Sequence, residues 1–200
     1  MLTFTAEEYE IIARLSAPGG WDQGEAEGIK KKIKDHLILK EIAFCCYCQI
    51  PMDEWHRMTI DIEHVLPKSV FPEFTFEIKN LNVSCKRCNM QIKGDDHSFY
   101  IGERGQATEF ASAHYKFVHP NLDSYEQHLV RKSEQLGKKV MVKYAVKTAK
   151  GRETYRYFEL MKIEKAMVDR AQGLRGTRAV KTLSRRRAAE AEDLLRAETH

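Results

Sequence analysis

Hydrophobic and polar residues follow a helical period in the first part of the chain. Residues 6–15 mix apolar residues with good helix formers, and the run Pro-Gly-Gly at 18–20 ends this first element. Apolar residues then recur at every fourth position between residues 29 and 37, which is the spacing of an amphipathic helix. Asp22 and Glu25 precede this stripe in a capping-box-like arrangement and predict its start. Two N-terminal helices are therefore expected.

A change to a period of two marks a strand. Apolar and polar residues alternate over residues 58–65, and Pro67 ends the regular ladder. Residues 80–83 predict a second short strand, which is followed by a cysteine knuckle and a short helix. The order expected in this region is hairpin, knuckle, helix.

Further helix and strand patterns follow in the last part of the chain. We expect a helix at 123–135, a strand at 140–146 and, after a turn at Gly151, a partner strand at 154–158 that completes a hairpin. The next predicted helix has an apolar stripe, and the last predicted helix spans residues 177–197. The stripe consists of Leu160, Ile163, Met167 and Ala171.

The composition restricts the class of protein. A chain of 200 residues with 42% hydrophobic residues can bury an ordinary core, and no apolar run approaches the ~20 residues of a membrane span. The N-terminus has neither the basic nor the apolar segment of a secretory signal, so we expect a cytoplasmic protein without disulfides. The net charge of +4 is mild, but the basic residues are clustered, which suits a polyanionic partner.

Four of the five cysteines form two CxxC pairs, Cys45 with Cys48 and Cys85 with Cys88. In this spacing one tight turn presents two thiolates to a single ion, so the two pairs predict a tetrathiolate zinc site. Four thiolates fill the tetrahedral shell, which makes this ion structural and moves any chemistry elsewhere. Cys46 is the odd thiol, and we expect it to be a small buried side chain.

The segment around these pairs resembles the HNH endonucleases, the zinc-stapled branch of the ββα-metal (His-Me finger) nucleases. A looser likeness, at residues 119–128 and 150–154 and in the helix after them, is to stand-alone HNH proteins of antiphage defence such as the nuclease component of the Septu system. The HNH resemblance rests on the two CxxC pairs, Glu63-His64-Val65-Leu66-Pro67-Lys68-Ser69, Asn80-Leu81, Asn89 after the last cysteine, and Lys93-Gly94.

The resemblance implies roles for several of these residues. His64 would be the general base that takes a proton from water, oriented by the side-chain carbonyl of Asn80. Glu63 and Asn89 would hold one catalytic divalent ion through hard oxygen ligands; Mg²⁺ is expected, with Mn²⁺ or Ni²⁺ as alternatives. Hydrolysis would leave 5′ phosphates on the products.

Two features depart from the family pattern. The family more often has Asp before the histidine, so Asp61 competes with Glu63 as the ligand of the divalent ion. Independently of the family pattern, strict strand alternation sends Glu63 and His64 to opposite faces, so we expect the pleat to break at these two residues. Three residues separate Asn89 from Lys93 where the family has two, which leaves the place of that lysine open.

Basic residues cluster in two places outside this segment. Lysines at 30, 31, 32 and 34 lie on the predicted second helix; a solvated helix face is favoured, and contact with a phosphate backbone is the alternative. The basic stretch at 174–187 fits binding to nucleic acid or to an acidic partner as well as it fits a solvated end of the chain. A solvated surface is favoured for the other histidines, and a structural or partner-facing role is an alternative at two of them, His119 and His128.

The sequence therefore predicts an α+β protein with an HNH core. Residues 1–43 would form an N-terminal helical segment, 44–100 the nuclease core, and 101–200 a C-terminal elaboration of helix, hairpin and helix. The expected activity is metal-dependent hydrolysis of DNA largely without regard to sequence, with RNA as an alternative substrate. An ATPase could be a partner subunit in a defence complex. The rival function is a zinc-knuckle module that binds nucleic acid or protein and cuts nothing.

Overall fold

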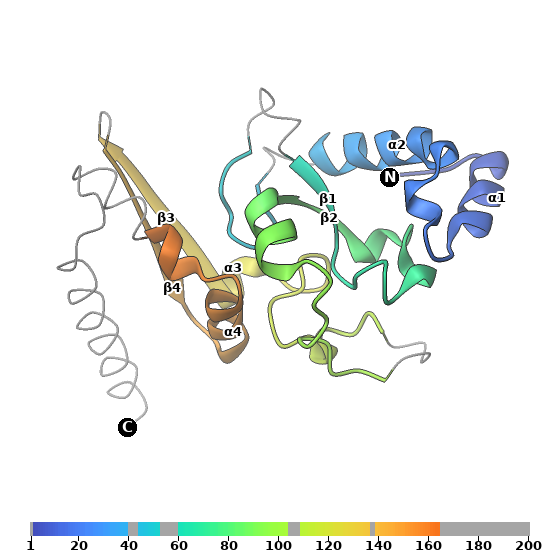
Figure 1. Cartoon of the computed structure of the whole chain (residues 1–200). Helices are drawn as coiled ribbons and strands as arrows, with labels where there is room; N and C mark the ends of the chain where they lie inside the picture. The colour runs from blue at the N-terminus through green and yellow to red at the C-terminus, as the bar shows by residue number, and fades with distance from the viewer. Residues whose placement is uncertain (1, 40–43, 53–59, 104–108, 137–138, 165–200) are drawn as a thin grey trace. The chain divides into compact units, whose positions relative to one another are not determined.

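A computed structural model describes residues 2–39, 44–52, 60–103, 109–136 and 139–164 (Figure 1). The chain forms two compact units, one of residues 1–131 with 144–161 and the other of residues 132–143 with 162–200. The first unit contains the four paired cysteines and His64.

Helices and small antiparallel sheets alternate along the described chain, which makes the fold α+β. The strands form two two-stranded sheets, β1 with β2 and β3 with β4. The strands are β1 (Ile60–His64), β2 (Leu81–Cys85), β3 (Leu129–Leu136) and β4 (Lys139–Val146). The α-helices are α1 (Ala6–Leu15), α2 (Glu27–Leu39), α3 (Tyr125–His128) and α4 (Ala149–Tyr157). Short 3₁₀ turns lie at Gly20–Asp22, Gly24–Ala26, Pro72–Phe74, Ile78–Asn80 and Ser112–His114, and the π-helix η6 spans Arg87–Lys93.

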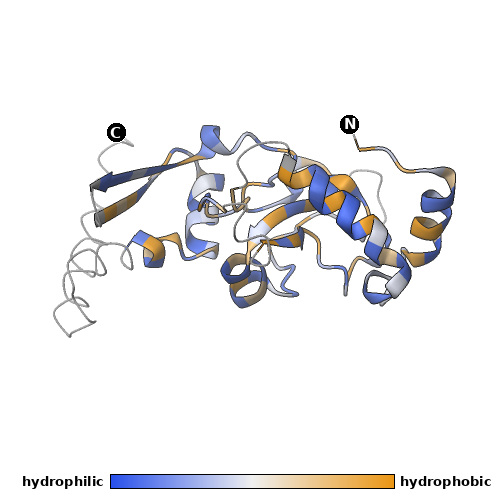
Figure 2. Cartoon of the chain, turned by 90° about the horizontal axis from the view of Figure 1, so that it is seen from above, coloured by the Kyte–Doolittle hydropathy of each residue, from blue (hydrophilic) through white to orange (hydrophobic). Residues whose placement is uncertain are grey.

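The N-terminal helices pack on the β1–β2 hairpin through one apolar core. Ile29 and Ile33 are buried in this core together with Leu81 of β2, and Leu37 packs against it. Figure 2 shows α2 with a hydrophobic stripe beside a strongly hydrophilic one. The predicted apolar stripe is thus confirmed.

The start predicted for the second helix was wrong. Asp22 lies in a 3₁₀ turn, its carboxylate accepts from Lys68 Nζ at 2.8 Å, and α2 begins only at Glu27. Lys68 is distant in sequence, and its contact with Asp22 removes the carboxylate from the role of a helix cap.

β1 and β2 form a regular antiparallel pair. Ile60 lies opposite Cys85 and His64 lies opposite Leu81, with each residue between them paired in register. The predicted strands are confirmed over these residues. A second core of aromatic rings adjoins the hairpin, where Tyr47 stacks on Phe158 with ring centroids 4.0 Å apart.

Two predictions for the last part of the chain were wrong. The helix expected at 123–135 is the short α3 followed by strand β3, and β3 rather than residues 154–158 pairs with β4. Residues 154–158 instead lie in and just after α4, whose first turn is capped by Thr148 Oγ1 accepting from the Gly151 amide at 3.1 Å. The strand predicted at 140–146 is confirmed as part of β4.

Part of the C-terminal prediction lies outside the described residues. The stripe residues Leu160 and Ile163 are buried in a helical segment at 160–164. Met167, Ala171, the basic stretch 174–187 and the final helix 177–197 are beyond this range. Among the described residues, no helix has the length and apolar character needed to span a membrane.

Gly151 allows α4 to approach the end of α3 closely. A Cβ atom at this position would lie 2.0 Å from the carbonyl oxygen of His128. We expect Gly151→Ala to lower the free energy of unfolding by about 2 kcal/mol, because backbone atoms must move apart. Gly28→Ala is the matched control: a Cβ there meets nothing within 4 Å, so α2 should gain about 0.5 kcal/mol. Equal denaturation midpoints for the two variants would contradict the packing of α4.

Candidate functional site

The four paired cysteines converge on one point. One Sγ atom from each of Cys45, Cys48, Cys85 and Cys88 lies within 4.8 Å of the others. This donor set fits a tetrahedral zinc ion, and three of the four residues are buried, as a structural site requires. Cys46 is 7% exposed and outside the cluster, so its prediction as a buried odd thiol is confirmed. The four cysteines could therefore hold a structural zinc ion.

Hydrogen bonds hold the first cysteine knuckle, residues 45–48, against the rest of the unit. The amide of Cys46 donates to the carbonyl of Val83 in β2 at 3.0 Å. Two tyrosine hydroxyl groups from the C-terminal part of the unit donate to knuckle carbonyls: Tyr125 to Tyr47 at 2.9 Å and Tyr144 to Cys48 at 2.5 Å. The knuckle is thus held from the hairpin and from α3 and β4.

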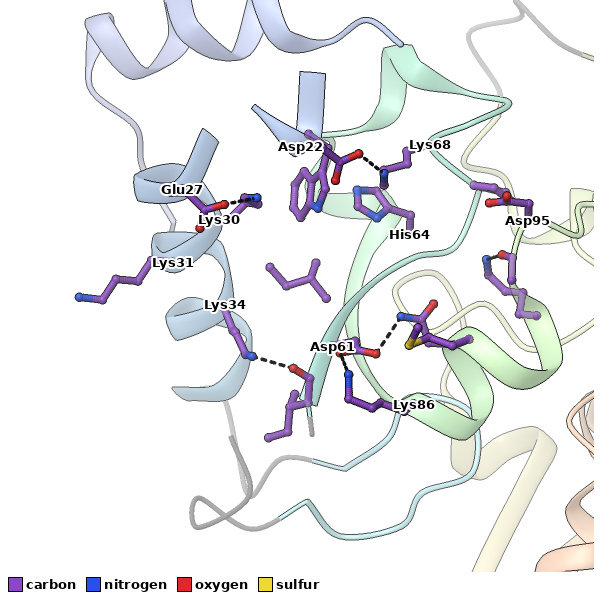
Figure 3. Close-up of a pocket in the computed structure, with 18 residues that line it drawn as sticks. Asp22, Glu27, Lys30, Lys31, Lys34, Asp61, His64, Lys68, Lys86 and Asp95 are labelled. Carbon is purple, nitrogen blue, oxygen red and sulfur yellow. Dashed lines mark hydrogen bonds and ion pairs between the residues drawn. The ribbon is translucent and has the colours of Figure 1, made fainter. Parts of the chain in front are cut away.

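A pocket of about 760 Å³ opens beside β1 (Figure 3). Its lining comes from the segment 21–34, from β1 with the loop after it, and from η6. Figure 3 shows His64 beside Asp22 and Lys68, and Asp61 further along β1 beside Lys86. His64, Asp61, Asn89 and Lys93 all contribute to the lining, whereas Glu63 and Asn80 do not.

His64 is held in one orientation. Its Nε2 lies 3.0 Å from the carbonyl oxygen of Thr75, and Trp21 stands edge-on with ring centroids 4.5 Å apart. Because a carbonyl oxygen only accepts, Nε2 carries the proton of the neutral ring and the lone pair is on Nδ1. Burial lowers the pKa of His64 to about 4, so the imidazole is neutral at pH 7 and can accept a proton.

Asp61 and Asn89 approach each other from β1 and η6. Asn89 Nδ2 lies 3.3 Å from Asp61 Oδ2, and Lys86 Nζ lies 3.2 Å from Asp61 Oδ1. The Asp61 side chain is 21% exposed. The Asn89 amide nitrogen donates to Asp61 in this arrangement. The carboxylate of Asp61 and the amide oxygen of Asn89 are the hard oxygen donors that a divalent ion such as Mg²⁺ prefers.

Glu63 points away from the pocket into the interior. It is fully buried, its Oε1 lies 3.0 Å from Lys93 Nζ, and the same oxygen accepts from Tyr47 Oη at 3.1 Å. Burial raises the pKa of Glu63, and the ion pair with Lys93 opposes this shift. The expected break in the pleat was wrong: β1 remains regular through His64, because Glu63 finds its cation on its own face of the strand.

The π-helix η6 accounts for the unusual spacing between Asn89 and Lys93. The amide of Gly94 donates to the carbonyl of Asn89, five residues earlier, at 2.7 Å. A π-helical turn contains one more residue than an α-helical turn, so three residues separate Asn89 from Lys93 within this turn. Lys93 thereby reaches Glu63 beneath the pocket.

Asn80 organises the loop after β1 rather than touching the imidazole. Its Oδ1 accepts from the Leu66 amide at 2.7 Å, and its Nδ2 donates to the carbonyls of Leu66 and Phe74 at 3.0 and 3.1 Å. This loop carries Thr75, whose carbonyl holds the His64 ring. Asn80 therefore acts on His64 through the backbone.

Sequence reasoning missed the contribution of Trp21 to this site. The contact between Trp21 and His64 joins distant segments, and no local pattern indicates it. The preference for a solvated surface was also wrong for His119, which is fully buried and accepts from the Asn121 amide through Nδ1 at 3.1 Å.

No protein-family model matches the chain. The chain is similar to the Septu protein PtuB of Bacillus thuringiensis. The two are 26% identical over 158 residues, which cover 78% of this chain and 51% of PtuB. The chain thus spans about half the length of this relative. An alignment of 158 residues is longer than the segment 44–100, so the similarity to PtuB extends beyond the cysteine pairs and the hairpin. It supports a relationship to a defence protein.

The cysteine cluster makes a prediction about metal content. Cys85→Ser should lose zinc and lower the melting temperature sharply, because binding of a structural zinc ion contributes folding free energy of about 10 kcal/mol or more in zinc-finger peptides. Cys46→Ala is the matched control, since Cys46 is buried beside the cluster but is not part of it. It should keep one zinc ion per chain by metal analysis. Unchanged zinc content in Cys85→Ser would refute the site.

Proposed function

We propose that this chain is a metal-dependent endonuclease of the HNH class that hydrolyses phosphodiester bonds in DNA. The observation that carries the proposal is the imidazole of His64, held by the Thr75 carbonyl, which lines the same pocket as Asp61 and Asn89. A ββα-metal arrangement of β1, β2 and η6, with a zinc ion on the four cysteines, would give this pocket its rigidity.

The residues of the pocket can divide the reaction between them. His64 Nδ1 would take a proton from water as the water oxygen attacks phosphorus and the bond to the 3′ oxygen breaks, leaving a 5′ phosphate. Lys68 and Lys86 line the pocket and would bind the phosphate oxygens. Asp61 and Asn89 would hold a divalent ion, Mg²⁺ by preference. Such an ion supplies charge neutralisation at phosphorus and at the leaving oxygen.

Asp61 is a better candidate ligand than Glu63. Asp61 is partly exposed in the pocket, whereas Glu63 is buried and paired with Lys93. We therefore assign Glu63 a positioning role, in which its ion pair fixes η6, and with it Asn89, against β1. Asn80 has a similar role at the other end of β1, through the loop that carries Thr75.

The biological role that we propose is based on the similarity to PtuB. Similarity to the Septu protein PtuB suggests a role in antiphage defence, in which this chain would be the nuclease and would act with partner subunits. A larger ATPase subunit that aims the nuclease or holds it inactive fits this setting. Copurification of the chain with the products of neighbouring genes tests it, and a fully active monomer that retains none of them would count against it.

Substitution of His64 tests the nuclease directly. His64→Ala should reduce plasmid nicking and cleavage in Mg²⁺, Mn²⁺ or Ni²⁺ at least about 100-fold, because the general base is lost. Zinc content should be unchanged, because the four cysteines are intact. His97→Ala is the matched control, since His97 is exposed and does not line the pocket.

Two results would contradict the proposal. Equal cleavage by His64→Ala and by the unsubstituted chain would remove the histidine from the mechanism. Salt-sensitive DNA binding without turnover under any of the three ions would favour the rival function, a zinc-knuckle module that binds but does not cut.

A further inference from the structure

One wall of the pocket comes from a part of the chain that lies outside the predicted nuclease segment. α2 contributes Lys30, Lys31 and Lys34 to the lining. We infer that these three lysines bind phosphate groups of the DNA strand that runs through the pocket, beside the bond that is cut. This inference rests on the proposed function, because it assigns substrate binding to the same pocket.

The rotation of α2 about its axis determines which lysines face the pocket. Ile29 and Ile33 are 2% and 0% exposed, so the apolar stripe is fixed in the core. Lys30 and Lys34 are four residues apart and therefore share a neighbouring face of the helix. Lys32 lies toward α1, where its Nζ is 2.7 Å from Glu8 Oε2. A solvated face was favoured for these four lysines from the sequence. In the structure Lys32 pairs with Glu8 of α1, and the other three lysines line the pocket.

Specific contacts hold two of these ammonium groups at the pocket. Lys34 Nζ donates to the carbonyl oxygen of Ile60, the first residue of β1, at 2.6 Å. Lys30 Nζ forms an ion pair with Glu27 and lies 5.6 Å from the centroid of the Trp21 ring, and Trp21 also packs on His64 (Figure 3). Long side chains that are already ordered lose less conformational entropy when they bind a ligand. The lysines of α2 can therefore bind an anion next to the candidate catalytic residues at a low cost in conformational entropy.

The charge of the pocket lining favours a polyanion. Six lysines line the pocket against four carboxylates; Lys93 is paired with the buried Glu63, so the other five lysines exceed the carboxylates by one, and bound Mg²⁺ would add further positive charge. Lys68 and Lys86 come from other walls, so cations surround His64 and Asp61 on more than one side. The regular phosphate backbone of a nucleic acid matches several separate ammonium groups, and each such contact releases counterions when it forms. The phosphate oxygens bind irrespective of base sequence.

The salt dependence of DNA binding tests the inference. A duplex oligonucleotide is titrated without added Mg²⁺ onto chains that carry His64→Ala, so that none is cleaved. Replacement of Lys30, Lys31 and Lys34 by Gln should weaken binding to unrelated sequences alike, and should reduce the slope of log K against log salt by about 2 to 3. Lys31→Gln alone, at an exposed position without a described contact, should reduce the slope by about 1 and leaves the fold intact.

The control removes the same charge elsewhere in the first unit. Lys79, Lys116 and Lys147 are exposed, do not line the pocket, and are replaced together by Gln. A slope that changes no more in the α2 variants than in this control overturns the inference, even if the unsubstituted chain cleaves DNA. A reduced slope in the α2 variants supports it, even if the unsubstituted chain fails to cleave and the proposed nuclease is wrong.

Discussion

Convergence of four cysteine sulfur atoms is the constraint on which the site depends. Cys85 ends β2 opposite Ile60, and Cys88 directly precedes Asn89, so a tetrahedral ion at the four sulfurs would fix one end of the hairpin and the first turn of η6 together. Asn80 fixes the other end of the hairpin through three hydrogen bonds from its side chain to backbone atoms of the loop after β1. β1 lies between these two anchors. Asp61 and His64 point to opposite faces of this regular strand, and both line the pocket because it opens along the strand.

Between the anchors, two acidic residues of β1 that share one face have different surroundings, because Asp61 is partly exposed and Glu63 is buried. Glu63 turns inward to Lys93 and Tyr47, and this buried network joins the first knuckle, the strand and the π-helix. A buried ion pair contributes little net stability, because the desolvation of its charges offsets their attraction, but removal of one partner is costly. Its value here is positional: it holds η6, and therefore Asn89, at a fixed distance from Asp61.

The sequence predicted the parts of the site that depend on short-range patterns. The spacing of the two CxxC pairs predicted a shared ion, the run Pro-Gly-Gly predicted the end of the first helix, and hydrophobic periods of four and of two residues located the stripe of α2 and β1. It did not predict contacts between distant segments. Three such contacts arise from packing of the N-terminal helices and leave no pattern in the local sequence. Trp21 packs on His64, Asp22 pairs with Lys68, and lysines of α2 line the pocket. β3 was missed because its polar residues give no alternation, and α4 because Gly151 indicated a turn, whereas it permits close helix packing.

Anomalous X-ray diffraction from crystals of the zinc-loaded chain soaked in Mn²⁺ tests the central claim most directly. We expect a zinc peak among the four cysteine sulfurs and a separate manganese peak in contact with oxygen atoms of Asp61 and Asn89, on the side of the pocket lined by His64. A manganese peak at Glu63, or the imidazole of His64 turned away from a pocket that binds no manganese, would contradict it.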